Sequence, residues 1–238
     1  MSRKNTLSQQ DWPEFMASRG ESTRHAALAR FYRADWPVAA TPLEEVQFVA
    51  LDVETTGLDA RRHAIVSIGL IPFTLDRIRS DQAWYQVVSP QTELIPESVT
   101  FHHITHSDIH QAPRFGNILE DLLERLAGKV AVVHYRNIER GFIEQATQQA
   151  LGESLLFPVI DTMQIEADLH PGREPGWLSR LFGKKPLSIR LADSRTRYGL
   201  PLYQAHHALT DALATAELLQ AQVATHFSPQ LPLGDLWC

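Results

Sequence analysis

The stretch FVALDVETTGLD, residues 48–59, begins as an apolar β-strand and then carries two carboxylates. Asp52 and Glu54 are two positions apart, so on an extended chain both side chains point to the same face. A strand apolar enough to lie in a core does not ordinarily carry two like charges on one face, because each loses hydration without gaining a partner. The pair is therefore either a solvated strand end or part of a site that supplies positive charge.

The turn after the two acids favours the second interpretation. Residues 55–58, TTGL, form a tight, glycine-containing turn. Such a turn brings backbone N–H groups and a small side chain close to whatever the acids hold.

The composition bounds the class of protein. The chain has 238 residues, 44% of them hydrophobic and 21% charged, which fits one compact domain with extensions. No run approaches the length of a membrane span, and the N-terminal segment MSRKNTLSQQDWPEF lacks the apolar stretch of a secretory signal. The only cysteine, Cys238, excludes a disulfide framework and a cysteine-based zinc site. We expect a soluble, cytoplasmic protein with no membrane partner.

The charge is unevenly distributed. A net charge of −6 argues weakly against a protein that coats nucleic acid by bulk electrostatics. Residues 173–197, however, contain seven cations and two anions, with Trp177 and Phe182 interleaved. Lys184 and Lys185 lie in this basic segment. It is either a docking surface for phosphates and bases or a solvated loop.

The apolar pattern predicts a mixed β-sheet flanked by helices, an α/β fold. Residues 1–44 form a helical extension, in which we expect Ser22 to cap a helix through residues 23–36. The aromatic residues Trp12, Phe15 and Trp36 indicate that this extension packs on the body. We expect strands at residues 46–53, 64–73, 83–89 and 129–135, and helices at residues 115–128, 138–151 and 207–227. Three strands in succession, followed by alternating helices and a strand, imply the mixed sheet.

Two further acids lie at helix starts. Glu139 follows the strand at residues 130–133, where an acid also complements the helix dipole in the ordinary way. Asp211 lies in the first turn of the last long helix, off its expected buried stripe and free to serve a site. That stripe is formed by Leu209, Ala212, Leu213, Ala216 and Leu219.

Two histidines precede Asp211. His206 lies five residues before it, in the preceding turn, where its ring can lean over the same cleft. His207, four residues before Asp211, would share its helical face and is the rival candidate. A lone histidine near a helix start is most often structural.

The order and spacing of these motifs resemble a known family. D-x-E-x-T-G, then a strand followed by H-Y-R-N-x-E, then H-x-A-x-x-D is similar to the three motifs of the DEDD-type 3′→5′ exonucleases, in the branch with a histidine in the last motif. That group contains the proofreading subunit of bacterial replicative polymerases and ribonuclease T. The resemblance spans residues 45–222, leaving 1–44 as the extension and 223–238 as a tail. It implies a ribonuclease-H-like exonuclease fold.

The resemblance also implies roles for particular residues. Two divalent cations, Mg²⁺ or Mn²⁺, would activate water and stabilise the leaving oxygen, and His206 would be the general base. The products would be nucleoside 5′-monophosphates released from the 3′ end of DNA, in replication proofreading or repair. The metal ligands would be Asp52, Glu54, Asp211 and Glu139. The residues that hold the terminal nucleotide would be Thr55, Thr56, Leu58, Glu97 and His102, and Asp161 would be a supporting acid.

One departure from the family pattern concerns Glu139, where the family has aspartate. Glutamate adds a methylene and moves the oxygens by about an ångström, a misplacement that can be costly in an active site. Arg136 and Asn137 also replace the usual small residues. The alternative function is therefore a weak or inactive exonuclease-fold module that binds 3′ ends, a polymerase or a sliding clamp.

Two points stay open. RNA is the alternative substrate, because nothing in the sequence reads the 2′-hydroxyl recognisably. The tail SPQLPLGDLWC weakly resembles the Gln-Leu-x-Leu peptides that bind sliding clamps, although an ordinary proline-rich tail explains it as well.

Overall fold

The fold is a five-stranded mixed sheet with helices on both faces. The structure is a computed structural model and describes residues 11–90, 104, 106–172 and 186–238. The strand order is β3-β2-β1-β4-β5. β2 pairs antiparallel with both of its neighbours, β1 and β3, whereas β4 pairs parallel with β1 and β5 pairs parallel with β4. This arrangement confirms the expected α/β class. The strands are β1 (Phe48–Thr55), β2 (Ile65–Phe73), β3 (Trp84–Val87), β4 (Val130–Val133) and β5 (Val159–Asp161).

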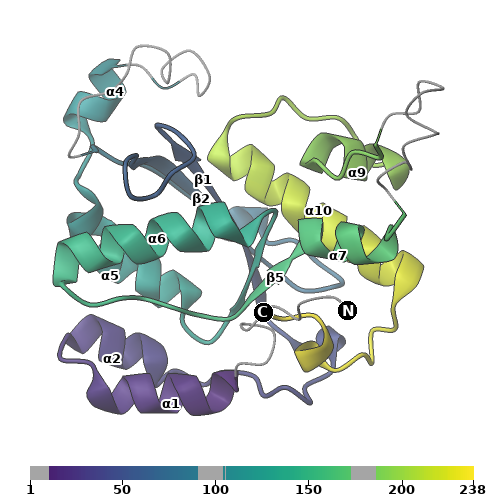
Figure 1. Cartoon of the computed structure of the whole chain (residues 1–238), viewed down its shortest axis with the longest axis horizontal. Coiled ribbons are helices and arrows are strands. Elements are labelled where there is room, and N and C mark those ends of the chain that lie inside the picture. Colours follow the sequence, from purple (N-terminus) through teal and green to yellow (C-terminus); the bar gives the residue numbers. More distant parts are fainter. Residues whose placement is uncertain (1–10, 91–103, 105, 173–185) are drawn as a thin grey trace.

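The helices divide between the two sides of the sheet (Figure 1). The helices are α1 (Trp12–Ser22), α2 (Ala26–Tyr32), α4 (His106–Gln111), α5 (Phe115–Leu126), α6 (Arg136–Leu151), α7 (Thr162–Leu169), α9 (Leu191–Arg197) and α10 (Ala208–His226). Three 3-10 turns complete the description: η2 (Leu43–Glu45), η3 (Ser80–Gln82) and η4 (Leu233–Asp235). The expected helices at 115–128, 138–151 and 207–227 are confirmed within a few residues.

The central strand β1 separates two hydrophobic clusters. Its odd-numbered residues, such as Leu51, belong to the cluster formed with α2, α5 and α6, whereas Phe48 and Ala50 belong to the cluster formed with α7 and α10. Alternate side chains of a strand point to opposite faces. The even-numbered Asp52 and Glu54 therefore face α10.

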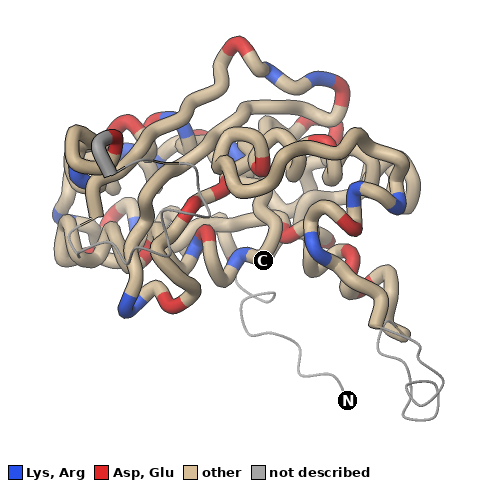
Figure 2. Tube along the Cα trace, turned by 90° about the horizontal axis from the view of Figure 1, so that it is seen from above, with Lys and Arg blue, Asp and Glu red and all other residues tan. Residues whose placement is uncertain are grey.

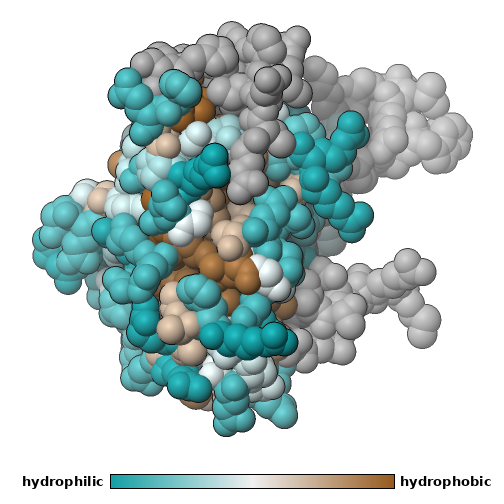
Figure 3. Space-filling model, turned by 90° about the vertical axis from the view of Figure 1, so that its left-hand side faces the viewer, coloured by the Kyte–Doolittle hydropathy of each residue, from teal (hydrophilic) through white to brown (hydrophobic). Residues whose placement is uncertain are grey.

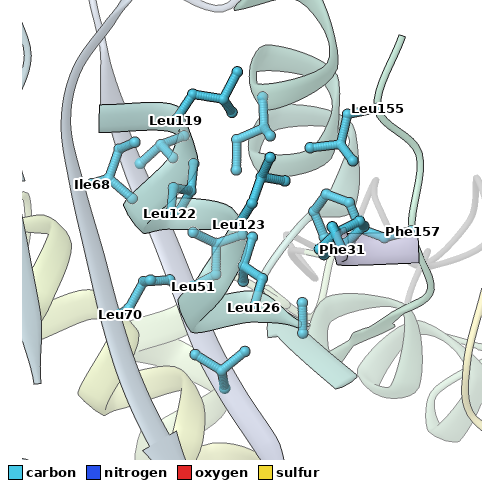
Figure 4. Packing of buried hydrophobic residues seen from close by; sticks show 14 of the residues in the cluster. Phe31, Leu51, Ile68, Leu70, Leu119, Leu122, Leu123, Leu126, Leu155 and Phe157 are labelled. Carbon is cyan, nitrogen blue, oxygen red and sulfur yellow. The ribbon is translucent and has the colours of Figure 1, made fainter. Parts of the chain in front are cut away.

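The N-terminal helices pack on this body. Trp12 is buried, and the ring of Phe31 in α2 lies 6.2 Å from that of Phe157, edge to face. Figure 4 shows Phe31 and Phe157 in the same cluster as the leucines of α5 and β1. The expected packing of the extension on the body is confirmed.

The expected cap at Ser22 is wrong. Ser22 is the last residue of α1, which begins after Asp11, whose carboxylate accepts the N–H of Glu14. The second helix, α2, begins after His25 and has no side-chain cap. The first helix begins earlier than expected, because Asp11 caps it and the proline after Trp12 favours its first turn.

The C-terminal tail folds back onto the body. Leu233 is fully buried, and its N–H donates to the carbonyl of Thr41 (2.9 Å). The N–H of Cys238 donates to the carbonyl of Val159 (2.8 Å), so the tail covers the free edge of β5. Covering an edge strand blocks pairing with other chains.

Candidate functional site: a carboxylate cluster at the end of the central strand

Two of the expected acids lie at the carboxyl end of β1. Asp52 pairs with Gly69 of β2 and Glu54 pairs with Ser67, and the register shifts directly after Glu54. Irregularities of this kind often re-aim a side chain next to an active site. Glu54 is only 6% exposed, so its carboxylate is largely removed from water.

A close backbone contact brings the third acid to these two. A Cβ built on Gly69 would lie 2.4 Å from the carbonyl carbon of Ala208, the first residue of α10. The missing side chain therefore lets α10 begin directly on β2. Asp211, in the first turn of α10, is carried to the end of β1 where Glu54 lies.

Glu54, His206 and Asp211 form one group. Each offers a ligand atom, and these atoms all lie within 4.8 Å of one another. The backbone N–H of His206 donates to Oδ2 of Asp211 (2.8 Å). His206 has a φ of 71°, which lies in the left-handed region that residues other than glycine seldom adopt. The strained conformation is consistent with a functional position.

His207 lies elsewhere. Its ring stacks on Tyr85 of β3, with the ring centroids 4.6 Å apart and the planes 19° apart. It is the residue before the first turn of α10. The structure thus brings His206, and not the rival His207, together with the acids.

The fourth expected acid, Glu139, lies in the first turn of α6 and is 3% exposed. Burial raises the pKa of its carboxyl well above the usual value, and the charge of Asp161 adds to this. Its Oε2 atom is buried without a hydrogen-bond partner among the described residues. An unpartnered buried carboxylate oxygen is unstable unless a cation or proton compensates it.

Asp161 supports this region, as the resemblance implied. Its carboxylate accepts the backbone N–H groups of Tyr135 and Arg136 (both 3.1 Å) and the guanidinium of Arg136 (3.2 Å). It also caps α7 by accepting the N–H of Met163 (3.0 Å). These contacts join the ends of β4 and β5 to the start of α6, where Glu139 lies.

Burial and like charges together determine the electrostatics of the cluster. Burial raises the pKa of the Asp52 carboxyl well above its usual value and is the largest of the causes. The charges of Glu139, Glu54 and Asp211 raise the pKa of Asp52 further. Burial also raises the pKa of Asp211, while the N–H of His206 lowers it. Carboxylate oxygens that repel one another in a buried place suit a hard divalent cation, so the donor set fits a metal.

The expected substrate residues fall into two groups. Thr55 ends β1 and donates its hydroxyl to the carbonyl of Gly57 (2.8 Å), and Thr56 accepts the N–H of Ala64 (3.0 Å). Leu58, in the same β1–β2 loop, is 84% exposed. Glu97 and His102 lie outside the described residues.

The basic segment is partly internal, which corrects the idea that its cations act as one surface. Arg197 pairs with Glu166, whose carboxylate is buried, and Arg195 is itself buried. Arg190 is exposed. Trp177, Phe182, Lys184 and Lys185 lie outside the described residues. Figure 2 shows blue Lys and Arg residues interspersed with red Asp and Glu residues along the chain.

Arg195 is a residue that the sequence did not single out. Its Nη1 donates to the carbonyl of Ala214 (2.7 Å), and its Nη2 donates to the carbonyl of Pro201 (2.8 Å) and to Glu217 (2.7 Å). Its guanidinium also lies 4.6 Å from the ring centroid of Tyr203. Arg195 therefore fastens the loop that precedes His206 to α10.

Gly69 and Tyr85 were also missed. A single glycine inside the apolar run at residues 64–73 is a signal of close backbone approach, and it could have been used. The stack of Tyr85 on His207 and the burial of Arg195 have no comparable local signal, because both depend on which helix reaches the sheet.

A hollow lined by both polar and apolar side chains lies apart from the acids. It is lined by the β1–β2 loop and by α5 and α6, including Ile65, Phe115 and Phe142. Figure 3 shows apolar surface within a hollow on the face at the left of Figure 1. The residues that line this hollow include no aspartate or glutamate, so the carboxylate chemistry lies elsewhere.

Comparisons with known proteins agree with the geometry. The family model RNase_T, described as exonuclease, matches residues 49–219. DNA polymerase III subunit epsilon of Treponema pallidum is 29% identical over 192 residues, which cover 81% of this chain and 82% of that protein. DNA polymerase III PolC-type of Oceanobacillus iheyensis is 29% identical over 201 residues, and the chain spans only 13% of its length.

A solved structure shares the fold. The nuclease domain of 3′hExo, a DEDDh family member bound to rAMP, superimposes with a TM-score of 0.60 at 12% identity, covering 76% of this chain and 92% of that one. Within the described part of the chain, no helix combines the length and apolar character needed to cross a bilayer.

Proposed function

This chain belongs to the exonuclease family, and from that membership we propose that it is a metal-dependent 3′→5′ exonuclease acting on DNA. It releases nucleoside 5′-monophosphates one at a time, in replication proofreading or repair. We assign this activity to residues 45–222, with residues 1–44 as a helical extension and 223–238 as a tail.

One observation carries the proposal: oxygen and nitrogen ligand atoms of Glu54, His206 and Asp211 gather within 4.8 Å. Asp52 and Glu139 add negative charge beside them, since the charge of Glu139 raises the pKa of Asp52. We assign Asp52, Glu54, Asp211 and Glu139 as ligands of two divalent cations, Mg²⁺ or Mn²⁺.

The chain's own residues orient the reaction. When bound, divalent cations would neutralise the scissile phosphate and lower the pKa of a water molecule, so that it loses a proton more readily. His206 accepts the proton of that water, because a neutral imidazole ring offers a free nitrogen lone pair as a general base. The N–H of His206 holds Asp211, which fixes base and carboxylate relative to each other. Thr55, Thr56, Leu58, Glu97 and His102 hold the 3′-terminal nucleotide.

Glu139 is the feature that favours the alternative function, a weak or inactive module that binds 3′ ends. Its longer side chain starts from the first turn of α6 and ends in a buried oxygen that has no hydrogen-bond partner in the described part of the chain. That oxygen can still serve a cation, which supports an active enzyme. We therefore rank the active exonuclease first.

The DNA preference and the partner are the finer parts of the proposal. The epsilon relative is a DNA polymerase subunit, which supports DNA and a polymerase partner, whereas the 3′hExo structure holds a ribonucleotide. For the tail to bind a sliding clamp, Leu233 would have to leave the hydrophobic core, where it is fully buried. A polymerase is accordingly the better supported partner.

The test is a substrate panel. Single-stranded DNA, duplex DNA, DNA with a 3′ overhang and RNA are incubated with Mg²⁺, with Mn²⁺ or with a chelator. We expect metal-dependent release of 5′-mononucleotides, fastest from a DNA 3′ end. Binding of these oligonucleotides without any nucleotide release would instead establish the binding module.

A further inference from the structure

Two exposed leucines lie on the loops next to the carboxylate cluster. Leu58 is 84% exposed and Leu202 is 77% exposed, the highest values among the large apolar side chains of the described residues. Leu58 follows Glu54 by four residues, and Leu202 precedes His206 by four. Both loops lie at the upper edge of the sheet in Figure 1. The resemblance to the exonucleases gives a role to Leu58 and none to Leu202.

The loop that carries Leu202 is held on both sides of it. The buried Arg195, 2% exposed, donates to the carbonyl of Pro201 (2.8 Å) and lies over the ring of Tyr203. The hydroxyl of Tyr203 donates to Glu217 of α10 (2.9 Å). Leu202 is therefore kept in solvent between two anchored neighbours.

This arrangement differs from an ordinary surface leucine. Isolated exposed leucines are common and need no explanation. A leucine whose neighbours are fixed cannot easily turn onto the protein surface, so its apolar area stays available to a ligand. Fixing a binding residue in advance lowers the entropy lost when the ligand binds.

We infer that Leu202 packs against a nucleobase of the strand being degraded, at one of the three nucleotides nearest its 3′ end. The inference rests on the proposed function, because the strand reaches Leu202 only if its 3′ end lies at Glu54, His206 and Asp211. Every base offers a flat apolar face, so such a contact recognises single-stranded nucleic acid without reading its sequence. Leu202 thereby favours unpaired 3′ ends, because a base in a single strand turns toward Leu202 by unstacking alone, whereas a base in a duplex must also break its pairing.

The experiment compares Leu202→Ser with a matched control, Val38→Ser. Val38 is 55% exposed and lies in the segment before η2, which precedes the amino end of β1, whereas Asp52 and Glu54 lie toward the carboxyl end of that strand. The substrates are a single-stranded oligonucleotide, the same strand in a blunt duplex, and three versions that lack the base at the first, second or third nucleotide from the 3′ end. We expect Leu202→Ser to raise KM for the single strand about five- to tenfold, with kcat changed less. Val38→Ser leaves both constants unchanged.

The abasic substrates identify the contact. Removing the base that Leu202 touches should raise KM of the parent protein by a similar factor and should have no further effect on Leu202→Ser. The inference is overturned if the increases in KM caused by the variant and by base removal multiply at all three positions. It is also overturned if Leu202→Ser has the same kcat and KM as Val38→Ser. Melting temperatures of both variants exclude a folding defect.

Failure of the inference and failure of the proposed function are distinguishable. An active parent with unchanged Leu202→Ser kinetics removes only the inference. If the parent releases no nucleotides, fluorescence anisotropy with the labelled single strand replaces the kinetics. If Leu202→Ser binds the labelled strand more weakly than the parent and Val38→Ser binds it as tightly as the parent, the contact is supported. Equal affinities of the two variants refute it.

Discussion

Gly69 of β2 and Ala208 of α10 are in direct backbone contact, so close that a Cβ on Gly69 would lie 2.4 Å from the carbonyl carbon of Ala208. Gly69 is also the strand partner of Asp52. One small residue thus joins the strand that carries two acids to the helix that carries the third.

The substitution Gly69→Ala tests this contact. The added methyl group overlaps the backbone of α10, so α10 must move away from the sheet. We expect a loss of about 1–3 kcal/mol in the free energy of unfolding, as for other overpacked cores. We also expect about a hundredfold lower kcat, because Asp211 is displaced.

The control for Gly69→Ala is Gly141→Ala in α6, where nothing lies within 4 Å of the added Cβ. Alanine favours a helix over glycine by about 1 kcal/mol, so this variant should be slightly more stable and fully active. Chemical denaturation and single-turnover kinetics on both variants give the answer. Equal behaviour of the two variants would show that the contact with Ala208 is unimportant.

Asp52→Asn should make the protein more stable at neutral pH and less active as a nuclease. A carboxyl whose pKa is higher in the folded protein than in the unfolded chain destabilises the fold once it ionises, and the penalty disappears as the pH falls through the folded pKa. The variant should therefore melt higher than the parent at neutral pH without metal, by about 2–4 °C for each kcal/mol of repulsion relieved. The gain should shrink at acidic pH, where the carboxyl of the parent is protonated.

Nuclease activity of Asp52→Asn should fall by at least about a hundredfold, because a neutral amide is a poor ligand for Mg²⁺. Thermal melts across the pH range, with and without Mg²⁺, check both statements. A variant less stable than the parent at neutral pH would show that the carboxylates do not repel one another in the fold.

The histidines should rank in a fixed order. His206→Ala removes the proposed base and should lower kcat by about 10²–10⁴-fold. His207→Ala removes the stack on Tyr85 and should cost about 0.5–1.5 kcal/mol of stability with a smaller effect on kcat. The measurement is kcat at saturating substrate for both variants. The reverse order would assign the base to His207.

Arg195 should act on catalysis through the loop before His206. Replacing it alone leaves the carboxylate of Glu217 without its cation, so the test is the double variant Arg195→Met, Glu217→Gln, which removes both charges of the pair. The loop then loses the donor to Pro201, and we expect kcat to fall by about tenfold as His206 loses its fixed position. The pH dependence of kcat should keep its shape, since the base is the same residue. A shifted profile would mean that Arg195 acts on the base by charge.

Much of the fold could be predicted from the sequence because its signals are local. The alternation along β1 predicted that Asp52 and Glu54 share a face, and they share the face toward α10. The apolar pattern also predicted α5, α6 and α10. The expected buried stripe of α10 was less accurate, because Leu209 and Leu213 are partly exposed while Leu218 is buried. α10 is also covered by α9 and α7, because Ala214 accepts a hydrogen bond from Arg195 and Gln222 donates one to the carbonyl of Thr162.

The parts that could not be predicted depend on contacts between distant segments. Ser22 caps no helix because α1 runs from Trp12 to Ser22 and α2 begins only after His25, so the serine lies inside the first helix. The pairing of Arg195 with Glu217 and of Arg197 with Glu166 removes two cations from residues 173–197, for which the sequence left a docking surface and a solvated loop open. An arginine's burial is set by the helix it meets, and a charge count along the chain contains no information about that.

The central claim is that acids distant in the chain meet at one place and together bind divalent cations. Calorimetric titration of Mn²⁺ into the parent protein, Asp211→Asn and a surface control, Asp76→Asn, tests it most directly. Asp76 is exposed, beyond the end of β2. We predict binding to the parent and to Asp76→Asn, with the affinity lowered by at least about tenfold in Asp211→Asn, because a carboxylate ligand is lost. Equal Mn²⁺ binding by all three proteins, or none by the parent, would contradict the account.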